Sequence, residues 1–385
     1  MNSAAAPKSL SLIHLINGRS ANVGNGALTD GAEALLSEDL NHRVNWQRDC
    51  WDDYTFGERA FDASFVESIN LSDGMIVGGA VALNGRSFYG NTGMRFNLPL
   101  ELWPEIMKPL VFYGLSYRVW PGQVYEHLDQ LRRTFEYILS HDKMLLALRN
   151  DGTKQWLARE FGIEDDRLFV VPDPGVFAVA DPSGPYPEFQ PGRPNIIVAL
   201  NDEDREGRFV TTGRRESVLK GVAAALEKLV THYHANIILV PHYFDDYRAI
   251  ADVIDFCKPV IAHQNIIGTG LARIEGSRQF YGRYLHADAV ISMRVHSMSP
   301  CIGLGVPMVP LVSQGRMTDF LDGLGLDDLA VDAFAPDMTD RLVQAVVWTM
   351  QHQSEVRTRY LQARNTMREE ARTFNAMVSG LLDAC

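Results

Sequence analysis

The stretch ADAVISMRVHSMSPCIGLGVPMVPL, residues 287–311, places a helix-length segment between two short apolar runs. The runs Ala289–Ser292 and Met308–Val312 are continuously apolar, as strands buried on both faces of a sheet are. Ser297–Leu304 between them has the length of a short helix, and glycine and proline follow it. A strand, a helix and a second strand in this order predict a parallel α/β unit.

The same alternation recurs in both halves of the chain. The other expected strands are Leu10–Ile16, Met75–Gly78, Leu110–Tyr113, Leu145–Leu148, Leu168–Val171, Ile196–Leu200 and Ile237–Val240. The other expected helices are Ala27–Leu40, Gln123–Ser140, Thr153–Phe161, Arg215–Tyr233, Tyr247–Phe256, Arg278–Leu285 and a long region from about Thr339. Pro172–Pro194 is rich in proline, which disfavours both helix and central strand, so we interpret it as a linker. The sequence therefore predicts an α/β fold of two Rossmann-like parallel-sheet domains, 1–185 and 186–385, facing across a cleft, with functional residues just after the strands.

The composition excludes several classes of protein. Hydrophobic residues make up 46% and charged residues 22% of the 385 residues, which is typical of a globular chain. The net charge of −12, without a block of lysine or arginine, disfavours nucleic acid and anionic membranes as partners. The four cysteines form no CxxC pair, no apolar run is long enough to span a membrane, and the N-terminus lacks a signal-peptide pattern. We expect a cytoplasmic protein that binds any anionic ligand through a few arginines.

Two glycine motifs follow expected strands. In NVGNGA, residues 22–27, we predict that Asn22, Gly24 and Asn25 line a ligand at the start of a helix. The glycine spacing does not match the dinucleotide-binding fingerprint, and a tight turn is the structural alternative. Gly78 and Gly79 end another strand, where they allow either close approach of a ligand to the backbone or a simple turn.

Arg149 ends an apolar strand, where a guanidinium is costly to bury without an anionic partner. Its planar fork suits a carboxylate or a phosphate, and the structural alternative is an ion pair with Asp151 or Asp173. Asp173 stands between two prolines at the end of the next strand, which makes it a candidate general base or a residue that orients Arg149.

The Arg-x-His sequence at residues 294–296 is the sharpest local signal. Arg294 and His296 follow a strand and precede a helix that Ser297 or Ser299 would cap. A guanidinium, an imidazole and free backbone N–H groups together favour a ligand with a phosphate and a carboxylate. His242 also follows a strand and is a further candidate. The histidines and aspartates near residues 232–246 match no zinc template, so we expect no metal site.

In their order and spacing these stretches resemble the polysaccharide pyruvyl transferase family, from about Leu10 to Leu326. The matching segments are NVGNGA, DGMIVGGA, PLVFYGLSY, LALRNDGTKQWLAREFGIEDDRLFVVPDPGVF and ADAVISMRVHSMSPCIGLGVPMVPL. The resemblance implies a fold similar to GT-B glycosyltransferases and transfer of a pyruvyl group from phosphoenolpyruvate to a sugar, with release of phosphate. It places phosphoenolpyruvate on Arg149, Arg294 and His296. Where the family often has a lysine, this chain has Arg316, and an acid common in the family's N-terminal loop is replaced by Asn25-Gly26.

The chemistry of phosphoenolpyruvate gives each of these residues an expected role. Arg149 and Arg294 would neutralise the donor, His296 would transfer a proton or hold the leaving phosphate, and Asp173 or Asp151 would act as the base or orient Arg149. The reaction needs no metal or redox cofactor. The expected acceptor is a lipid-linked or nucleotide-linked saccharide or a growing glycan, as in exopolysaccharide biosynthesis, recognised through loops such as Asn84–Asn97. Association with glycan-assembly enzymes and a homo-oligomer stay open, as do two alternatives: a GT-B glycosyltransferase using a nucleotide sugar, and a non-catalytic glycan-binding protein.

Overall fold

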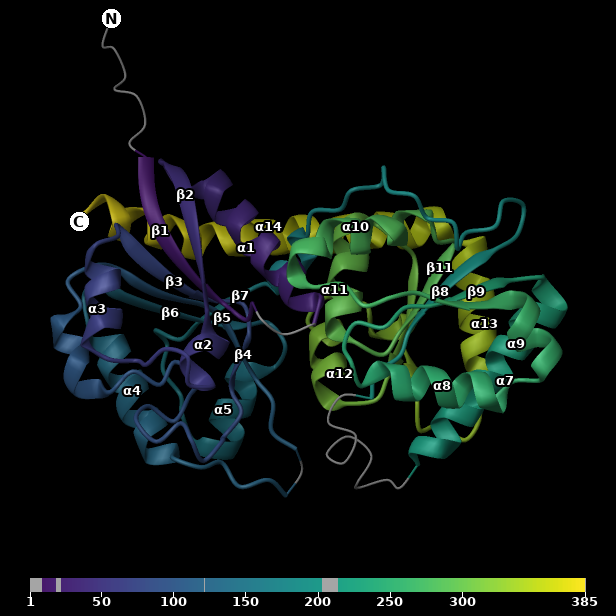
Figure 1. Cartoon of the computed structure of the whole chain (residues 1–385), viewed down its shortest axis with the longest axis horizontal. Coiled ribbons are helices and arrows are strands. Elements are labelled where there is room, and N and C mark those ends of the chain that lie inside the picture. The colour runs from purple at the N-terminus through teal and green to yellow at the C-terminus, as the bar shows by residue number, and fades with distance from the viewer. Residues whose placement is uncertain (1–8, 19–21, 121, 203–213, 385) are drawn as a thin grey trace, which may run out of the picture. The chain divides into compact units, whose positions relative to one another are not determined.

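The computed structural model describes residues 9–18, 22–120, 122–202 and 214–384 (Figure 1). The chain divides into two compact units. Unit 1 contains Met1–Arg19, Leu28–Pro174 and Thr366–Cys385, and unit 2 contains Ser20–Ala27 and Gly175–Asn365. Each unit is a parallel β-sheet with helices packed on it, so the predicted fold class of two Rossmann-like parallel-sheet domains is confirmed.

This division differs from the expected ranges 1–185 and 186–385 in three places. The boundary lies between Pro174 and Gly175, inside the proline-rich segment. The glycine motif at residues 22–27 belongs to unit 2, because it packs against histidines of that unit. The C-terminal end of the chain belongs to unit 1, because Phe374 and Val378 pack into an apolar core on the sheet of unit 1.

The sheet of unit 1 has seven strands in the order β2-β1-β3-β5-β6-β7, with β4 paired to β5. The strands are β1 (Ser9–Ile16), β2 (Arg43–Cys50), β3 (Gly74–Gly78), β4 (Val81–Leu83), β5 (Leu110–Tyr117), β6 (Met144–Arg149) and β7 (Phe169–Val171). The helices are α1 (Gly24–Asp39), α2 (Trp51–Thr55), α3 (Ala63–Asn70), α4 (Leu128–Ser140) and α5 (Thr153–Phe161), of which α1 starts in unit 2. A short 3₁₀ turn lies at Leu100–Glu105, and another, Pro174–Phe177, spans the boundary between the two units.

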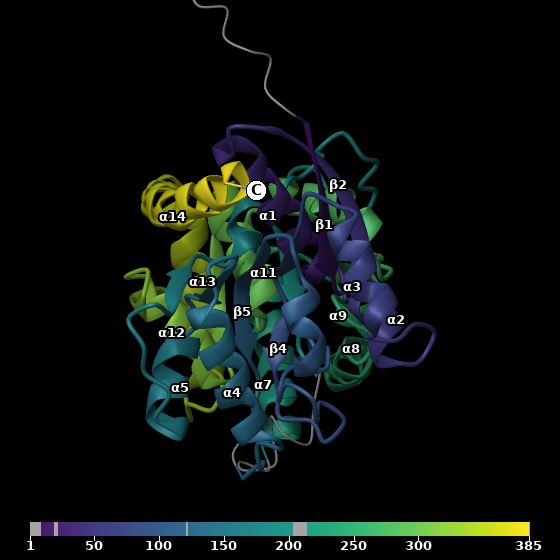
Figure 2. The same cartoon turned by 90° about the vertical axis from the view of Figure 1, so that its left-hand side faces the viewer.

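Helices cover both faces of this sheet (Figures 1 and 2). One face packs against α3, α4 and α5 through residues such as Phe65, Phe135 and Trp156. The other face packs against α1 and the end of α14 (Gln353–Asp383). Strands buried on both faces are mostly apolar, which is why continuous apolar runs of the sequence located β1, β3, β5 and β6. The run Leu168–Val171 located β7 as well, although this strand lies at the edge of the sheet and Val170 is exposed.

The sheet of unit 2 has six strands in the order β10-β9-β8-β11-β12-β13. The strands are β8 (Asn195–Ala199), β9 (Asn236–Leu239), β10 (Ile266–Gly268), β11 (Ala289–Ser292), β12 (Met308–Val312) and β13 (Val331–Asp332). The helices are α7 (Arg215–Tyr233), α8 (Asp246–Phe256), α9 (Pro259–Asn265), α10 (Ser277–Gly282), α11 (Val295–Leu304), α12 (Gly315–Asp322), α13 (Met338–Gln351) and the first part of α14. Three 3₁₀ turns lie at Ile274–Gly276, Arg283–His286 and Asp327–Leu329.

The core of unit 2 lies between the sheet and helices α7, α8, α9 and α13. Val198 of β8 and Ile291 of β11 are fully buried in it, together with Leu226 of α7. On α14, the Tyr360 hydroxyl donates to the carbonyl of Met308 in β12. Among the described residues, no helix combines the length and the apolar character that crossing a membrane requires.

Each sheet has a point at which the order of the strands reverses. In unit 1 the chain passes from β1 to β2 on one side and to β3 on the other. In unit 2 it passes from β8 to β9 on one side and to β11 on the other. Ligands of open parallel sheets bind beyond the carboxyl ends of the strands at such a reversal. The residues that follow β8 and β11 are therefore the first place to look for a site in unit 2.

Candidate functional site

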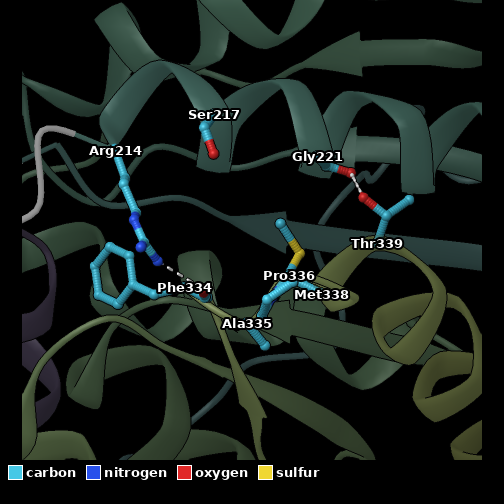
Figure 3. Close-up of a pocket in the computed structure, with 9 residues that line it drawn as sticks. Arg214, Ser217, Gly221, Phe334, Ala335, Pro336, Met338 and Thr339 are labelled. Atoms are coloured by element: carbon cyan, nitrogen blue, oxygen red, sulfur yellow. Dashed lines mark hydrogen bonds between the residues drawn. The ribbon is translucent and has the colours of Figure 1, made fainter.

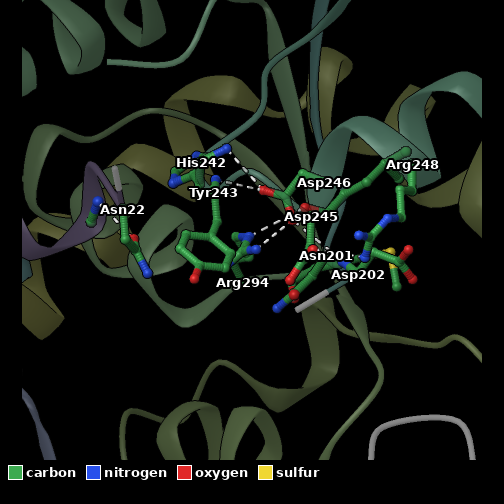
Figure 4. A network of polar contacts seen from close by, with 12 residues as sticks. Asn22, Asn201, Asp202, His242, Tyr243, Asp245, Asp246, Arg248 and Arg294 are labelled. Atoms are coloured by element: carbon green, nitrogen blue, oxygen red, sulfur yellow. Dashed lines mark hydrogen bonds and ion pairs between the residues drawn. The ribbon is translucent and has the colours of Figure 1, made fainter. Parts of the chain in front are cut away.

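Arg294 lies at the strand reversal of unit 2. It comes two residues after β11 and is the N-cap residue of α11. Its side chain is almost fully buried, its Nε donates to the carbonyl oxygen of Leu200 at 3.3 Å, and its guanidinium forms an ion pair with Asp246 (Figure 4). Leu200 directly follows β8, the neighbour of β11 in the sheet. The sheet thus holds a cation at the edge where a ligand of this fold would bind.

His296 is the second residue of α11 and lies against the glycine motif. A Cβ atom added to Gly24 would lie 2.5 Å from the Cβ of His296 and 2.7 Å from its Nδ1, so a side chain at position 24 would collide with the imidazole. The backbone carbonyl of His296 accepts a hydrogen bond of 2.6 Å from the Tyr281 hydroxyl. His296 is half-buried, whereas Arg294 is almost fully enclosed. The imidazole is therefore the more accessible of the two predicted groups.

The glycine motif is fixed by its own hydrogen bonds. The Asn22 side chain accepts the N–H of Gly24 at 3.1 Å, and the carbonyl of Asn22 accepts the N–H of Asn25 at 3.0 Å. The N–H of Val23 donates to the carbonyl of His242 at 3.2 Å. This tight turn, which was the structural alternative for the motif, opens α1, and Gly24 is a glycine because His296 occupies the space of a Cβ. Contact of the motif with a ligand stays a prediction.

His242 is fully buried beneath this motif. Its Nε2 lies 2.6 Å from the hydroxyl of Tyr284, which in turn lies 3.3 Å from the hydroxyl of Ser297. Burial lowers the pKa of His242 well below its usual value, and the nearby charges of Arg294 and Arg283 lower it further. His242 is therefore a neutral imidazole near neutral pH. Ser297 is also fully buried. We therefore expect His242 and Ser297 to hold the structure around the site and not to contact a ligand directly.

Arg149 lies in unit 1 and has internal partners. It is the last residue of β6, is fully buried, and donates to the carbonyl of Gly79 at 2.8 Å. Its guanidinium lies 3.3 Å from Asp173 and 4.0 Å from Asp151. This is the structural alternative considered for Arg149. A direct contact of Arg149 with a donor stays a prediction.

The two aspartates beside Arg149 are also fully buried. Asp151 accepts hydrogen bonds of 2.5 Å from the hydroxyls of Ser116 and Thr153. The backbone N–H of Asp173 donates to the side chain of Asn150 at 2.8 Å. Because Asp173 has no exposed surface, orienting Arg149 fits its position better than acting as a general base does.

Local structure explains why positions 78 and 79, at the end of β3, are glycines. A Cβ atom on Gly78 would lie 2.8 Å from Nε2 of His14, and Gly79 has a φ of 67°, in the left-handed region. His14 lies on β1, is buried, and its Nδ1 contacts Glu33 at 3.0 Å. The sequence analysis did not single out His14 as a neighbour of Gly78. A histidine inside an otherwise apolar strand indicates a buried polar contact, so the sequence did contain a signal for it.

Arg316, the proposed counterpart of the family lysine, is the second residue of α12 and is half-buried. It follows β12, the strand next to β11, at the same edge of the sheet of unit 2. The structure thus gathers one group of predicted residues in unit 2 and leaves the other in unit 1. The first group is Asn22, Gly24, Asn25, His242, Arg294, His296, Ser297 and Arg316, and the second is Gly78, Gly79, Arg149, Asp151 and Asp173.

Two described cavities lie elsewhere in unit 2. One of about 320 Å³ lies between the start of α7 and the segment before α13, where Arg214 donates to the carbonyl of Phe334 and Thr339 to that of Gly221, both at 3.1 Å (Figure 3). The other, of about 500 Å³, borders Arg193 and residues at the end of α13. Neither cavity is lined by Arg294 or His296. We therefore locate the candidate site by the side chains at the strand reversal of unit 2 and not by a cavity.

Solved structures show the fold alone. The chain is similar to the N-terminal domain of trehalose-6-phosphate phosphatase from Candida albicans (TM-score 0.52, 11% identity, 99% of this chain and 98% of that chain covered). It is also similar to a UDP-N-acetylglucosamine 2-epimerase from Listeria monocytogenes (0.53, 11%, 92% and 91%) and to ADP-heptose lipopolysaccharide heptosyltransferase II from E. coli (0.51, 12%, 90% and 100%). The expected similarity to GT-B enzymes is confirmed.

Sequence comparison identifies the family. None of the curated proteins has a sequence that matches this chain. The family described as polysaccharide pyruvyl transferase matches residues 22–315, which contain the glycine motif, the strand that ends in Arg149 and the Arg-x-His segment. This match covers most of the chain and confirms the predicted family. The chain belongs to the polysaccharide pyruvyl transferase family.

Proposed function

We propose that the protein transfers the pyruvyl group of phosphoenolpyruvate to two hydroxyls of a sugar, forming a cyclic ketal and releasing phosphate. Family membership supports a transferase that modifies polysaccharides and implies a sugar or glycan acceptor. The observation that carries the proposal is the position of Arg294 and His296 at the start of α11, at the strand reversal of unit 2.

The charges at this edge suit the donor. Phosphoenolpyruvate carries a phosphate and a carboxylate, and the first turn of α11 contributes the positive end of a helix. Arg294 brings a guanidinium that is already fixed in place by Asp246 and Leu200, so little order has to be gained on binding. His296 lies two residues further along the same turn. Unit 2 is therefore the proposed donor side of the enzyme.

The proposed reaction forms two bonds from sugar oxygens to C2 of phosphoenolpyruvate and breaks the bond from C2 to the phosphate oxygen. A proton adds to the methylene carbon C3 of phosphoenolpyruvate, which becomes a methyl group. The first sugar hydroxyl forms a bond to C2, the second hydroxyl forms another, and the bond between C2 and the phosphate oxygen breaks. Of the two hydroxyl protons, one replaces the proton that was delivered to C3, and the other leaves with the phosphate. Arginine and a helix N-terminus would stabilise the charge on the departing phosphate.

His296 is the proposed proton-transfer group. An imidazole changes protonation near neutral pH, which suits delivery of a proton to C3 or to the leaving phosphate. His296 is half-buried, whereas His242 is fully buried and neutral, so His296 is the histidine of the two that a substrate can reach. Asp173 is proposed to orient Arg149, to which it is paired. No step of this proposal is routed through a metal or a redox cofactor.

The test measures phosphate release and ketal formation with phosphoenolpyruvate and a panel of lipid-linked and nucleotide-linked saccharides. We expect Arg294→Ala to lower turnover by about 100-fold or more, because a cation that stabilises developing charge is lost. The matched control is Arg248→Ala, since Arg248 is exposed and pairs with Asp245 on the surface. Full turnover by Arg294→Ala would show that the site is assigned wrongly.

A nucleotide-sugar glycosyltransferase is the second candidate, because the fold is similar to that of a heptosyltransferase. Thermal denaturation separates the two. Stabilisation by millimolar phosphoenolpyruvate supports pyruvyl transfer, whereas stabilisation only by UDP or GDP sugars supports the glycosyltransferase. Incorporation of pyruvate into any sugar would exclude a non-catalytic glycan-binding protein.

A further inference from the structure

We propose that Asp246 is the positioning residue of the donor site: it holds the Arg294 guanidinium in the orientation that receives phosphoenolpyruvate. This inference rests on the proposed function, and it adds a residue that the sequence analysis did not assign to the donor site. Asp246 is the first residue of α8, and its side chain is fully buried.

The carboxylate of Asp246 ties together the ends of three neighbouring strands. One oxygen accepts the backbone N–H groups of His242 and Tyr243, both at 2.9 Å, in the segment that follows β9. The other accepts the N–H of Asp202 at 3.3 Å, in the segment that follows β8, and pairs with Arg294, which follows β11 (Figure 4). Since β9, β8 and β11 are adjacent in the sheet, one side chain fixes the edge where the ligand is expected.

A buried carboxylate is stable only with donors on both oxygens, and Asp246 has them. The three backbone N–H groups fix the carboxylate without help from Arg294. The carboxylate is therefore a rigid support for the guanidinium, which is further held by the bond from its Nε to Leu200. A guanidinium held at two points loses little freedom when an anion binds, so binding energy is not used to order it.

The neighbouring acids have other partners, which makes the assignment specific. Asp202 contacts Arg215 through both oxygens, at 2.6 and 2.7 Å. Asp245, adjacent in the sequence to Asp246, pairs with Arg248 at 2.7 Å. Of the three aspartates, Asp246 is the one that contacts Arg294.

The test is a double-mutant cycle with phosphoenolpyruvate as the varied substrate. Asp246→Asn keeps the size of the side chain but places an amide N–H₂ where an acceptor was. We expect the KM for phosphoenolpyruvate to rise by about tenfold to a hundredfold, since a misplaced reactive group costs that much. In an Arg294→Gln background the same change should have little further effect, because Asp246 acts through Arg294. Asp245→Asn is the matched control and should leave KM unchanged.

The outcomes separate this inference from the proposed function. Wild-type protein that neither binds nor turns over phosphoenolpyruvate would overturn the proposed function. Wild-type turnover together with an unchanged KM in folded Asp246→Asn, or with effects that multiply in the double variant, would overturn the role of Asp246 alone. If Asp246→Asn does not fold, Asp246→Glu enters the same cycle. Its longer side chain moves the guanidinium, so we expect a raised KM, and a wild-type KM would refute the proposal.

Discussion

Arg149 of unit 1 and Arg294 of unit 2 follow the same local pattern and lie in different settings. Both come at the end of a buried parallel strand, and both are paired with a buried aspartate. Arg149 ends β6, between β5 and β7 and away from the strand reversal of its sheet, and it has no exposed surface. Arg294 lies at the strand reversal, next to a helix N-terminus and the half-buried His296. The place of a strand in the sheet, rather than the residue type at its end, sets the two arginines apart: Arg294 lies where ligands of this fold bind, whereas a role of Arg149 in donor binding stays a prediction.

The largest expected effect comes from removing each arginine in turn. Arg149→Ala leaves Asp173 and Asp151 buried without their cation, so we expect a loss of about 3–5 kcal/mol of unfolding free energy. Arg294→Ala should instead lower turnover strongly in a protein that still folds. Denaturant unfolding and phosphate release, measured on both variants, check the contrast. A stable Arg149→Ala variant that fails to bind phosphoenolpyruvate would reverse the comparison and make Arg149 a donor-binding residue.

The glycine motif provides a smaller and more local test. Gly24→Ala forces a Cβ to within 2.5 Å of His296, so either the loop or the imidazole must move. We expect a cost of about 1–3 kcal/mol from overpacking, together with reduced turnover. The matched control is Gly380→Ala in α14, where a Cβ meets no atom within 4 Å and alanine favours the helix. Equal stability of the two variants would mean that the glycine motif does not pack on His296.

A fall in pH should affect the buried His242 of unit 2 and the partly buried Glu33 of unit 1 in different pH ranges. Because the pKa of His242 is lowered in the folded state, the unfolded chain binds a proton that the folded chain does not, and stability falls as pH drops below about 6.5. Burial raises the pKa of Glu33, but hydrogen bonds from His14 and Arg48 outweigh it and lower the pKa from 4.5 to about 2. The contribution of Glu33 is therefore present above about pH 4.5 and is lost between about pH 4.5 and pH 2.

The variants His242→Gln and Glu33→Gln test this difference. Unfolding free energy measured against pH should lose part of its slope between about pH 6.5 and pH 5 in the first variant, and between about pH 4.5 and pH 2 in the second. The Glu33 contribution should be about 2 kcal/mol or less, since solvent screens part of the pair. A His242→Gln profile that runs parallel to the wild type would show that folding does not lower the pKa of His242.

Much of the fold could be predicted because buried parallel strands are apolar along their whole length. Ala289–Ser292, Met308–Val312 and Arg215–Tyr233 have the same bounds in the sequence prediction and in the structure. Arg43–Cys50 was missed as a strand because it lies at the edge of its sheet, carries polar residues and is partly exposed. Val81–Leu83 is too short for a pattern to be read.

The Arg-x-His segment and the glycine motif could also be predicted from the sequence, because their chemistry lies within a few consecutive residues. Their partners could not. Asp246 is 48 residues from Arg294, and Leu200 is 94 residues from it. His14 of β1 and Gly78 of β3 likewise come together only because their strands are neighbours in the sheet.

Local sequence patterns were enough to locate the buried strands, the longer helices, the presence of two parallel sheets and the short charged motifs, but not the short or exposed edge strands. The order of the strands decided the rest: β8 lies between β9 and β11, which brings Asp246, Leu200 and Arg294 to one edge. The physical reason is that periodicity and local charge act over a few residues, whereas strand order is set by packing between segments that are distant in the chain.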